Sequence, residues 1–142
     1  MNAILLTAKA KDCDLILSRK KTVGVLKSTP NIETPFKVYL YCQKDTENTF
    51  QFIDGKRDFG KVVCEIICDR SKVSTTVLSD EAKACCMTAE DLSNNGKPIY
   101  FYHIARIFPY NTPKTLKEFH LCKDGKTVSK APQSFCYVEE LK

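Results

Sequence analysis

The chain has 142 residues, of which 43% are hydrophobic and 27% charged, and it carries a formal net charge of +5. This length and composition suit one globular domain spanning residues 1–142, and no stretch approaches the ~20 consecutive apolar residues that a membrane span requires. The start of the chain has neither a basic leader nor a cleavage pattern, so we expect a cytoplasmic protein without membrane contact, in which the eight cysteines stay reduced.

The first half of the chain predicts one short helix, three strands and a polar loop. Residues 9–18 carry apolar side chains at the spacing of an amphipathic helix, and residues 43–59 are the loop. The strands cover residues 4–6, 21–27 and 36–42. Alternation along the second strand places Val23 and Val25 on one face, and Thr22, Gly24 and Leu26 on the other.

The second half predicts three more strands and two helical segments. The strands cover residues 60–69, 99–108 and 134–139, and the first of them is nearly continuous in apolar residues, as expected of a strand buried on both faces. A capping-box pattern at residues 88–91 opens a short helix that ends at Asn94-Asn95-Gly96. Thr112 and Pro113 are typical of an N-cap and first helical residue, opening a turn that carries Leu116 and Phe119.

Six strands with helices too short to cover a doubly wound sheet favour an α+β fold. We expect a small, mostly antiparallel β-barrel with short helices at its openings.

One stretch resembles the signature of a known family. Residues 17–27 read Leu-Ser-Arg-Lys-Lys-Thr-Val-Gly-Val-Leu-Lys, which is similar to the ASCH signature Gly-x-Lys-x-x-Glu-x-Arg that follows the first helix in that family. Further stretches resemble a clostridial and phage-associated subgroup, at residues 34–42, 60–69, 85–88, 102–104 and 132–141. The resemblance implies a PUA-like barrel with a pocket where the signature strand meets the barrel mouth. It also implies a link to RNA binding and, in a few members, to hydrolysis of acylated nucleosides.

The sequence departs from this signature at its glycine, glutamate and arginine positions, which hold Arg19, Gly24 and Leu26, whereas Lys21 matches. We therefore expect no catalytic residues. If the site is active, Lys21 and Thr22 are the candidates for a residual N4-acylcytidine amidohydrolase, although alternation points them to opposite strand faces. Gly24 itself indicates either a bulge or close backbone approach or a pocket widened for a larger ligand.

A basic cluster around the signature supplies the candidate nucleic-acid contacts. Its members are Lys9, Arg19, Lys20, Lys21 and Lys27. The cluster is either a rim that contacts phosphate or a solvated helix end, where cations are favoured by the helix dipole.

The candidate pocket-lining residues are Thr22, Gly24, Leu26, His103, Gln133 and Ser134. For His103 the competing interpretation is a hydrogen-bonded core histidine, and for Gln133 and Ser134 it is turn chemistry. The aromatic residues at positions 100–102, 108 and 110 either stack on bases or fill the core. The cysteine spacing lacks a Cys-x-x-Cys pair, so we expect no metal site and no cofactor.

These observations favour a non-catalytic ASCH/PUA-like binding module that recognises RNA or a nucleotide through a basic rim at the barrel mouth. The alternative is a phage-encoded inhibitor of a bacterial defence system, comparable to an anti-CRISPR protein, which would bind a host defence protein. That alternative depends on the subgroup resemblance alone. The sequence leaves the oligomeric state open.

Overall fold

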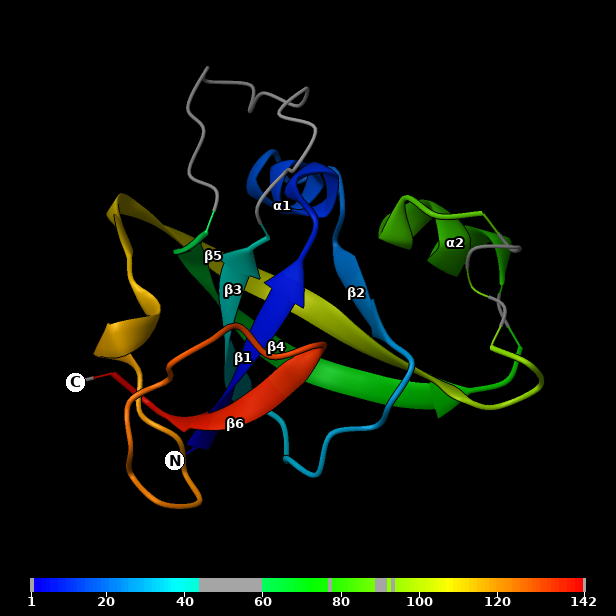
Figure 1. Ribbon diagram of the computed structural model, residues 1–142. Coiled ribbons are helices and arrows are strands. Elements are labelled where there is room, and N and C mark those ends of the chain that lie inside the picture. Colours follow the sequence, from blue (N-terminus) through cyan, green and yellow to red (C-terminus); the bar gives the residue numbers. More distant parts are fainter. Residues whose placement is uncertain (1, 44–59, 77, 89–91, 93, 142) are drawn as a thin grey trace.

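The computed structural model describes residues 2–43, 60–76, 78–88, 92 and 94–141 (Figure 1). The described residues form six strands, two α-helices and one 3-10 helix. In chain order these are β1 (Asn2–Ala8), α1 (Ala10–Leu17), β2 (Val23–Leu26), β3 (Phe36–Cys42), β4 (Lys61–Ser74), α2 (Ser79–Cys85), β5 (Ile99–Lys114), η1 (Leu116–Glu118) and β6 (Phe135–Glu139). None of the described helices is long and apolar enough to cross a membrane.

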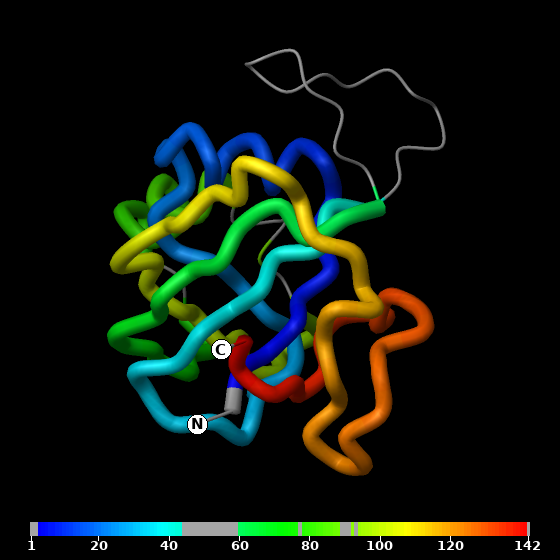
Figure 2. Tube along the Cα trace, turned by 90° about the vertical axis from the view of Figure 1, so that its left-hand side faces the viewer, coloured from blue at the N-terminus to red at the C-terminus, as the bar shows by residue number. Residues whose placement is uncertain are grey.

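All six strands belong to one curled sheet, in the order β2-β5-β4-β3-β1-β6. β1 and β3 run parallel, and the other neighbouring pairs are antiparallel. Figure 2 shows the strands side by side and tilted across the curled sheet. The predicted α+β, mostly antiparallel barrel is confirmed, with one refinement. β2 and β6 stand at opposite ends of the strand order, so the described sheet is open along a seam between them.

The main core lies on the inner side of the sheet, under α1. The helix buries Ala10, Cys13 and Ile16, which recur at intervals of three residues and therefore lie on one helical face. They pack in one cluster with inward-facing residues of the strands, among them Leu40 and Cys64. β4 is buried almost continuously from residue 62 to residue 68, as its apolar run predicted. This packing fixes α1 over one opening of the sheet (Figure 1).

The expected helical start at Thr112 and Pro113 is wrong. β5 continues through both residues to Lys114, and the 3-10 helix begins only at Leu116. The actual N-cap is Thr115, whose N–H donates to the Glu118 carboxylate at 2.8 Å. β2 pairs only with residues 100–103 of β5, so beyond residue 103 β5 is not paired with β2. Prolines are tolerated on such an unpaired strand edge, and both prolines of β5 lie beyond residue 103.

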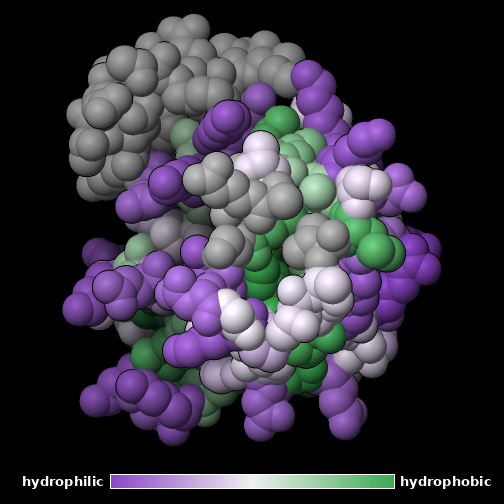
Figure 3. All heavy atoms as spheres, turned by 90° about the vertical axis from the view of Figure 1, so that its right-hand side faces the viewer, coloured by the Kyte–Doolittle hydropathy of each residue, from purple (hydrophilic) through white to green (hydrophobic). Residues whose placement is uncertain are grey.

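Helix α2 was not predicted. It lies on the outer face of β2 and β5, where Cys85 is buried against Phe101 and Ile99. Figure 3 shows this side of the molecule, with apolar atoms in the middle of the face and hydrophilic ones around them. The helix expected from the capping box falls largely on residues 89–91, and the expected polar loop on residues 44–59; both lie outside the described residues.

Each of the eight cysteines is a free thiol in the structure. Five of them are buried as small apolar side chains, namely Cys13, Cys42, Cys64, Cys68 and Cys85. Burial raises the pKa of Cys64 to about 12 and that of Cys85 to about 11. The thiols of Cys64 and Cys85 are therefore protonated and unreactive at neutral pH.

Candidate binding cleft

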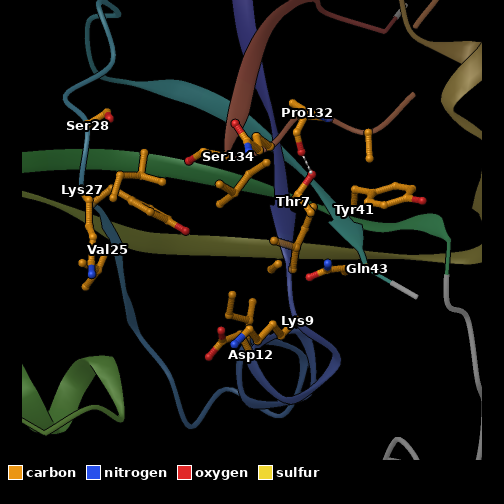
Figure 4. Close-up of a pocket in the computed structure, with 18 of the residues that line it drawn as sticks. Thr7, Lys9, Asp12, Val25, Lys27, Ser28, Tyr41, Gln43, Pro132 and Ser134 are labelled. Atoms are coloured by element: carbon orange, nitrogen blue, oxygen red, sulfur yellow. Dashed lines mark hydrogen bonds between the residues drawn. The ribbon is translucent and has the colours of Figure 1, made fainter. Parts of the chain in front are cut away.

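A cleft of about 930 Å³ lies at the seam of the sheet. Its walls come from α1, from the end of β2, from the ends of β1 and β3, and from residues 131–134, which lead into β6. Figure 4 shows Lys9 and Asp12 at α1, opposite Pro132 and Ser134 on the far wall. The cleft is therefore built where the two ends of the strand order fail to meet.

The floor of the cleft includes Tyr102, whose ring fills the space beside Gly24. The two residues face each other across β2 and β5. A Cβ atom on Gly24 would overlap the outer atoms of the Tyr102 ring. The close approach expected for this glycine is confirmed, and the wider pocket is wrong, because the aromatic ring occupies the vacated space. Burial raises the pKa of the Tyr102 hydroxyl, so this group stays protonated.

Lys21 is the buried cation of the cleft. Its residue is only 6% exposed, although it carries an ammonium group. The Lys21 Nζ lies 3.5 Å from Oδ1 of Asp12 on α1. At this distance the pair is loose, so the ammonium keeps donors for a ligand in the cleft. Its backbone N–H donates to the Leu15 carbonyl at 3.0 Å, which anchors the residue to the end of α1.

The far wall is tied to β1 by Thr7. The Thr7 Oγ1 donates to the Pro132 carbonyl at 2.8 Å (Figure 4), and its N–H donates to the Ser134 carbonyl at 2.9 Å. Both bonds use backbone carbonyls of the wall, so the side chains of Gln133 and Ser134 stay available to a ligand. The cleft thus combines an apolar floor with hydroxyl, amide and ammonium groups around it, as small-molecule sites do.

The structure brings together three of the five basic residues predicted to contact nucleic acid. Lys9, Lys21 and Lys27 line the cleft, the first and last of them exposed. Arg19 and Lys20 are exposed in the turn after α1 and are not part of its lining. Arg19 adopts a left-handed backbone with φ of 65°, as expected for the glycine position of the signature at a helix C-terminus.

Of the predicted pocket-lining residues, Leu26, Gln133 and Ser134 line the cleft. Gly24 is covered by Tyr102, and Thr22 is exposed on the side of α2, where its N–H donates to the Ala84 carbonyl at 2.9 Å.

His103 belongs to the outer face of the sheet rather than to the cleft. Its Nδ1 lies 2.6 Å from Oδ1 of Asp69, and it borders a separate hollow beneath α2. The expected hydrogen bond is present, but the histidine is about 30% exposed rather than buried in the core.

Asp12 and Tyr102 are among the cleft residues that were not assigned to the site from the sequence. Asp12 lies four residues before the buried Ile16 on α1, and this helical spacing was a usable signal that both face the cleft. From the sequence, Tyr102 was only one of five candidate aromatic residues. Its contact with Gly24 was not predicted, because that contact depends on the register between β2 and β5. Tyr100, Phe101 and Tyr102 are buried, so the core interpretation holds for these three aromatic residues.

The described residues contain no group of three or more histidine, cysteine, aspartate or glutamate side chains arranged to hold a metal ion.

No protein-family model matches the chain, and no curated protein matches it. Solved structures do match. The crystal structure of ASCH from Zymomonas mobilis has a TM-score of 0.69 at 14% identity, covering 97% of this chain and 88% of that chain. Two variants of the Zymomonas protein also match, each with a TM-score of 0.70 at 14% identity over 97% of this chain. The match covers 89% of the serine-to-alanine variant and 91% of the tyrosine-to-phenylalanine variant. The likeness shows that this chain has the ASCH fold.

Proposed function

We propose that the chain is a non-catalytic binding module related to the ASCH family, and that its seam cleft binds a nucleotide or a short single-stranded RNA. The observation that carries this proposal is the convergence of Lys9, Lys21 and Lys27 on one cleft, in which Asp12 is the single carboxylate among the described lining residues. An excess of ammonium groups favours a ligand that carries phosphate. The cleft volume of about 930 Å³ is sufficient for a nucleotide.

The lysines divide the cleft into two parts. Lys9 and Lys27 are exposed at its rim, where they are free to follow a phosphate backbone. Lys21 is buried, and it shares the cleft lining with Tyr102 and Leu26, which are also buried. A nucleotide has the matching division, with charged phosphate at one end and a planar, largely apolar base at the other.

The replaced signature positions support binding without catalysis. Gly24 offers no side chain and is covered by Tyr102, and Leu26 contributes only an apolar surface. Thr22 is not among the cleft residues, so Lys21 and Thr22 do not face a common ligand. An amidohydrolase needs a nucleophile and a proton acceptor on the same substrate.

Residual hydrolysis is the second candidate, because a buried lysine beside a carboxylate is an arrangement that catalytic sites also use. The test is turnover of N4-acetylcytidine by the wild type and by Lys21→Ala. Turnover that disappears in the variant would favour the enzyme over the binding module.

Titration of the protein with a fluorescent single-stranded RNA at several salt concentrations tests the main proposal. Each phosphate contact to a single strand contributes roughly 0.7 to the slope of log affinity against log salt. Three lysine contacts therefore predict a slope of about −2, and Lys27→Ala should reduce it by about 0.7.

Lys117→Ala is the matched control for this titration. Lys117 is an exposed lysine on η1 that does not line the cleft, so the slope should stay unchanged in this variant. Absence of binding at low salt, or equal effects of the two substitutions, would refute the proposal.

The protein-interaction role stays a prediction of the family resemblance. Pull-down with the tagged chain from a bacterial host tests it, with a co-purified defence nuclease as the expected result. Recovery of RNA and no protein would count against it.

A further inference from the structure

The outer edge of β2 carries main-chain groups that β5 does not use. In an antiparallel pair, residues whose N–H and C=O point at the neighbouring strand alternate with residues whose groups point away. The Ile104 N–H donates to the Thr22 carbonyl at 2.9 Å, so the Thr22 carbonyl points at β5, although the Thr22 N–H donates to α2. Gly24 and Leu26 follow at intervals of two residues and share this orientation. The N–H and C=O of Val23 and Val25 therefore point away from β5, and of these two residues Val25 lines the cleft while Val23 borders the hollow beneath α2.

A second observation places these Val25 groups in the cleft. The Val25 side chain packs on the outer face of the sheet, against the cluster beneath α2 that contains Cys85 and Phe101. Val25 nevertheless lines the cleft on the other side (Figure 4). One strand residue does not present its side chain to both faces of a sheet. Val25 therefore lines the cleft with its backbone.

The free edge is short because its flanks are occupied. On one side the Thr22 N–H donates to Ala84 of α2 at 2.9 Å. On the other side the Asn94 Nδ2 donates to the Lys27 carbonyl at 3.3 Å. The sheet edge across the seam is also covered, since residues 120–122 pair with the outer side of β6. Among the described residues, the unused main-chain donor and acceptor at the cleft thus belong to Val25.

We propose that the Val25 N–H and C=O bind the pairing edge of a nucleobase seated in the cleft. The proposal rests on the nucleotide-binding function above and names the part of the ligand that the chain recognises. A nucleobase pairing edge carries a hydrogen-bond donor beside an acceptor. The extended backbone of one residue offers the complementary pair. A peptide added as a new strand needs several successive free residues, and β2 has only four residues with both ends covered.

Recognition by a main-chain pair selects for an unblocked pairing edge rather than for one particular base. The ligand phosphates then lie toward the exposed Lys9 and Lys27, which line the same cleft. Charge holds the ligand in the cleft, and the Val25 backbone orients the base.

The test compares oligonucleotides of equal charge. Short single-stranded oligouridine is titrated against its N3-methyluridine counterpart, and oligoinosine against its N1-methylinosine counterpart. Methylation removes the donor of the pairing edge and adds bulk there without changing the phosphates. We expect affinity to fall about tenfold, as for the loss of one or two neutral hydrogen bonds. Equal affinity for methylated and unmethylated strands would refute the inference while leaving the proposed function intact. Failure of all four strands to bind would refute both.

Val25→Pro removes the N–H on the protein side. A free strand edge tolerates proline, and the preceding residue is Gly24, which has no Cβ to clash with the proline ring. This variant should lose affinity for unmethylated strands and no longer distinguish them from methylated ones. Val25→Ala shortens a side chain on the outer face and keeps the backbone intact, so a loss in this variant belongs to the side chain. Val23→Ala is the matched control, because Val23 packs in the same outer cluster and is not among the described cleft-lining residues. An equal loss in Val25→Ala would assign the effect to the side chain and overturn the inference. If Val25→Pro does not fold by circular dichroism, the comparison of methylated strands decides alone.

Discussion

The contact between Gly24 and Tyr102 makes a sharp prediction about stability. In Gly24→Ala, the added methyl group would overlap the outer atoms of the Tyr102 ring, and both residues lie in the packed interior. Forcing an extra methyl into a packed site costs about 1–3 kcal/mol. Alanine also restricts the unfolded chain, which returns about 0.5–1 kcal/mol. We therefore expect a net loss of about 1–2 kcal/mol in the free energy of unfolding.

Urea denaturation followed by circular dichroism measures this loss. The decisive comparison is a double-mutant cycle with Tyr102→Leu, because leucine lacks the ring atoms that the new methyl group would meet. In the Tyr102→Leu background, Gly24→Ala should cost less than about 0.5 kcal/mol, which gives a coupling energy of about 0.5–2 kcal/mol.

The same loss in both backgrounds would show that the cost arises elsewhere in β2, and that the Tyr102 ring is not the reason for a glycine at position 24. The cycle also bears on function. If the ring holds the place of the missing signature side chain, Gly24→Glu alone cannot restore that side chain to the cleft, since the ring blocks its path.

Three further predictions concern the turn after α1, the thiols and the outer face. Arg19→Gly should raise the free energy of unfolding by about 0.5–1 kcal/mol. Glycine removes left-handed backbone strain of about 1–2 kcal/mol, and the extra entropy of the unfolded glycine chain offsets part of this gain. Thermal melting measures the change, and a lower melting temperature would contradict the prediction. Iodoacetamide should modify the exposed Cys86 before any buried thiol. Cys64, for example, is buried, and burial raises its pKa to about 12. Early labelling of Cys64, measured by peptide mass spectrometry, would argue against its burial in the core. The hydrogen bond with His103 lowers the pKa of Asp69 in the folded protein. The pairing therefore stabilises the fold above the ordinary aspartate pKa, and this stabilisation is lost as pH falls through the lower native pKa. In His103→Ala, carboxyl NMR should show a higher pKa for Asp69, and an unchanged pKa would refute the pairing.

The strands were predictable because a local pattern marks each of them, either alternation or a continuous apolar run. β3 was found at its predicted bounds, and β4 was recognised by its apolar run. The sequence underestimated β4 and β5 at their C-terminal ends. Beyond residue 68 the β4 residues are mostly exposed, so the apolar signal stops while the pairing with β5 continues. Local patterns therefore predict where a strand is buried better than where it ends.

The cleft was only partly predictable, for a different reason. Lys21 and Leu26 were identified because they belong to one contiguous signature, and Ser134 because its loop re-enters the barrel. Tyr102 belongs to the cleft through strand register, and His103 is excluded from it by the same alternation along β5. Both assignments depend on which residues face each other across strands distant in sequence. Composition and spacing do not contain that information.

The first and last strands lie beside each other, with Asn2 in register with Glu139. During synthesis, β1, α1 and β2 leave the ribosome before residues 131–134, which form the opposite wall of the cleft. The cleft is therefore complete only after β1 to β5 have emerged. A chain that stops before residue 131 keeps Lys9, Lys21 and Lys27 yet lacks the opposite wall, so the proposed binding requires residues 131–134.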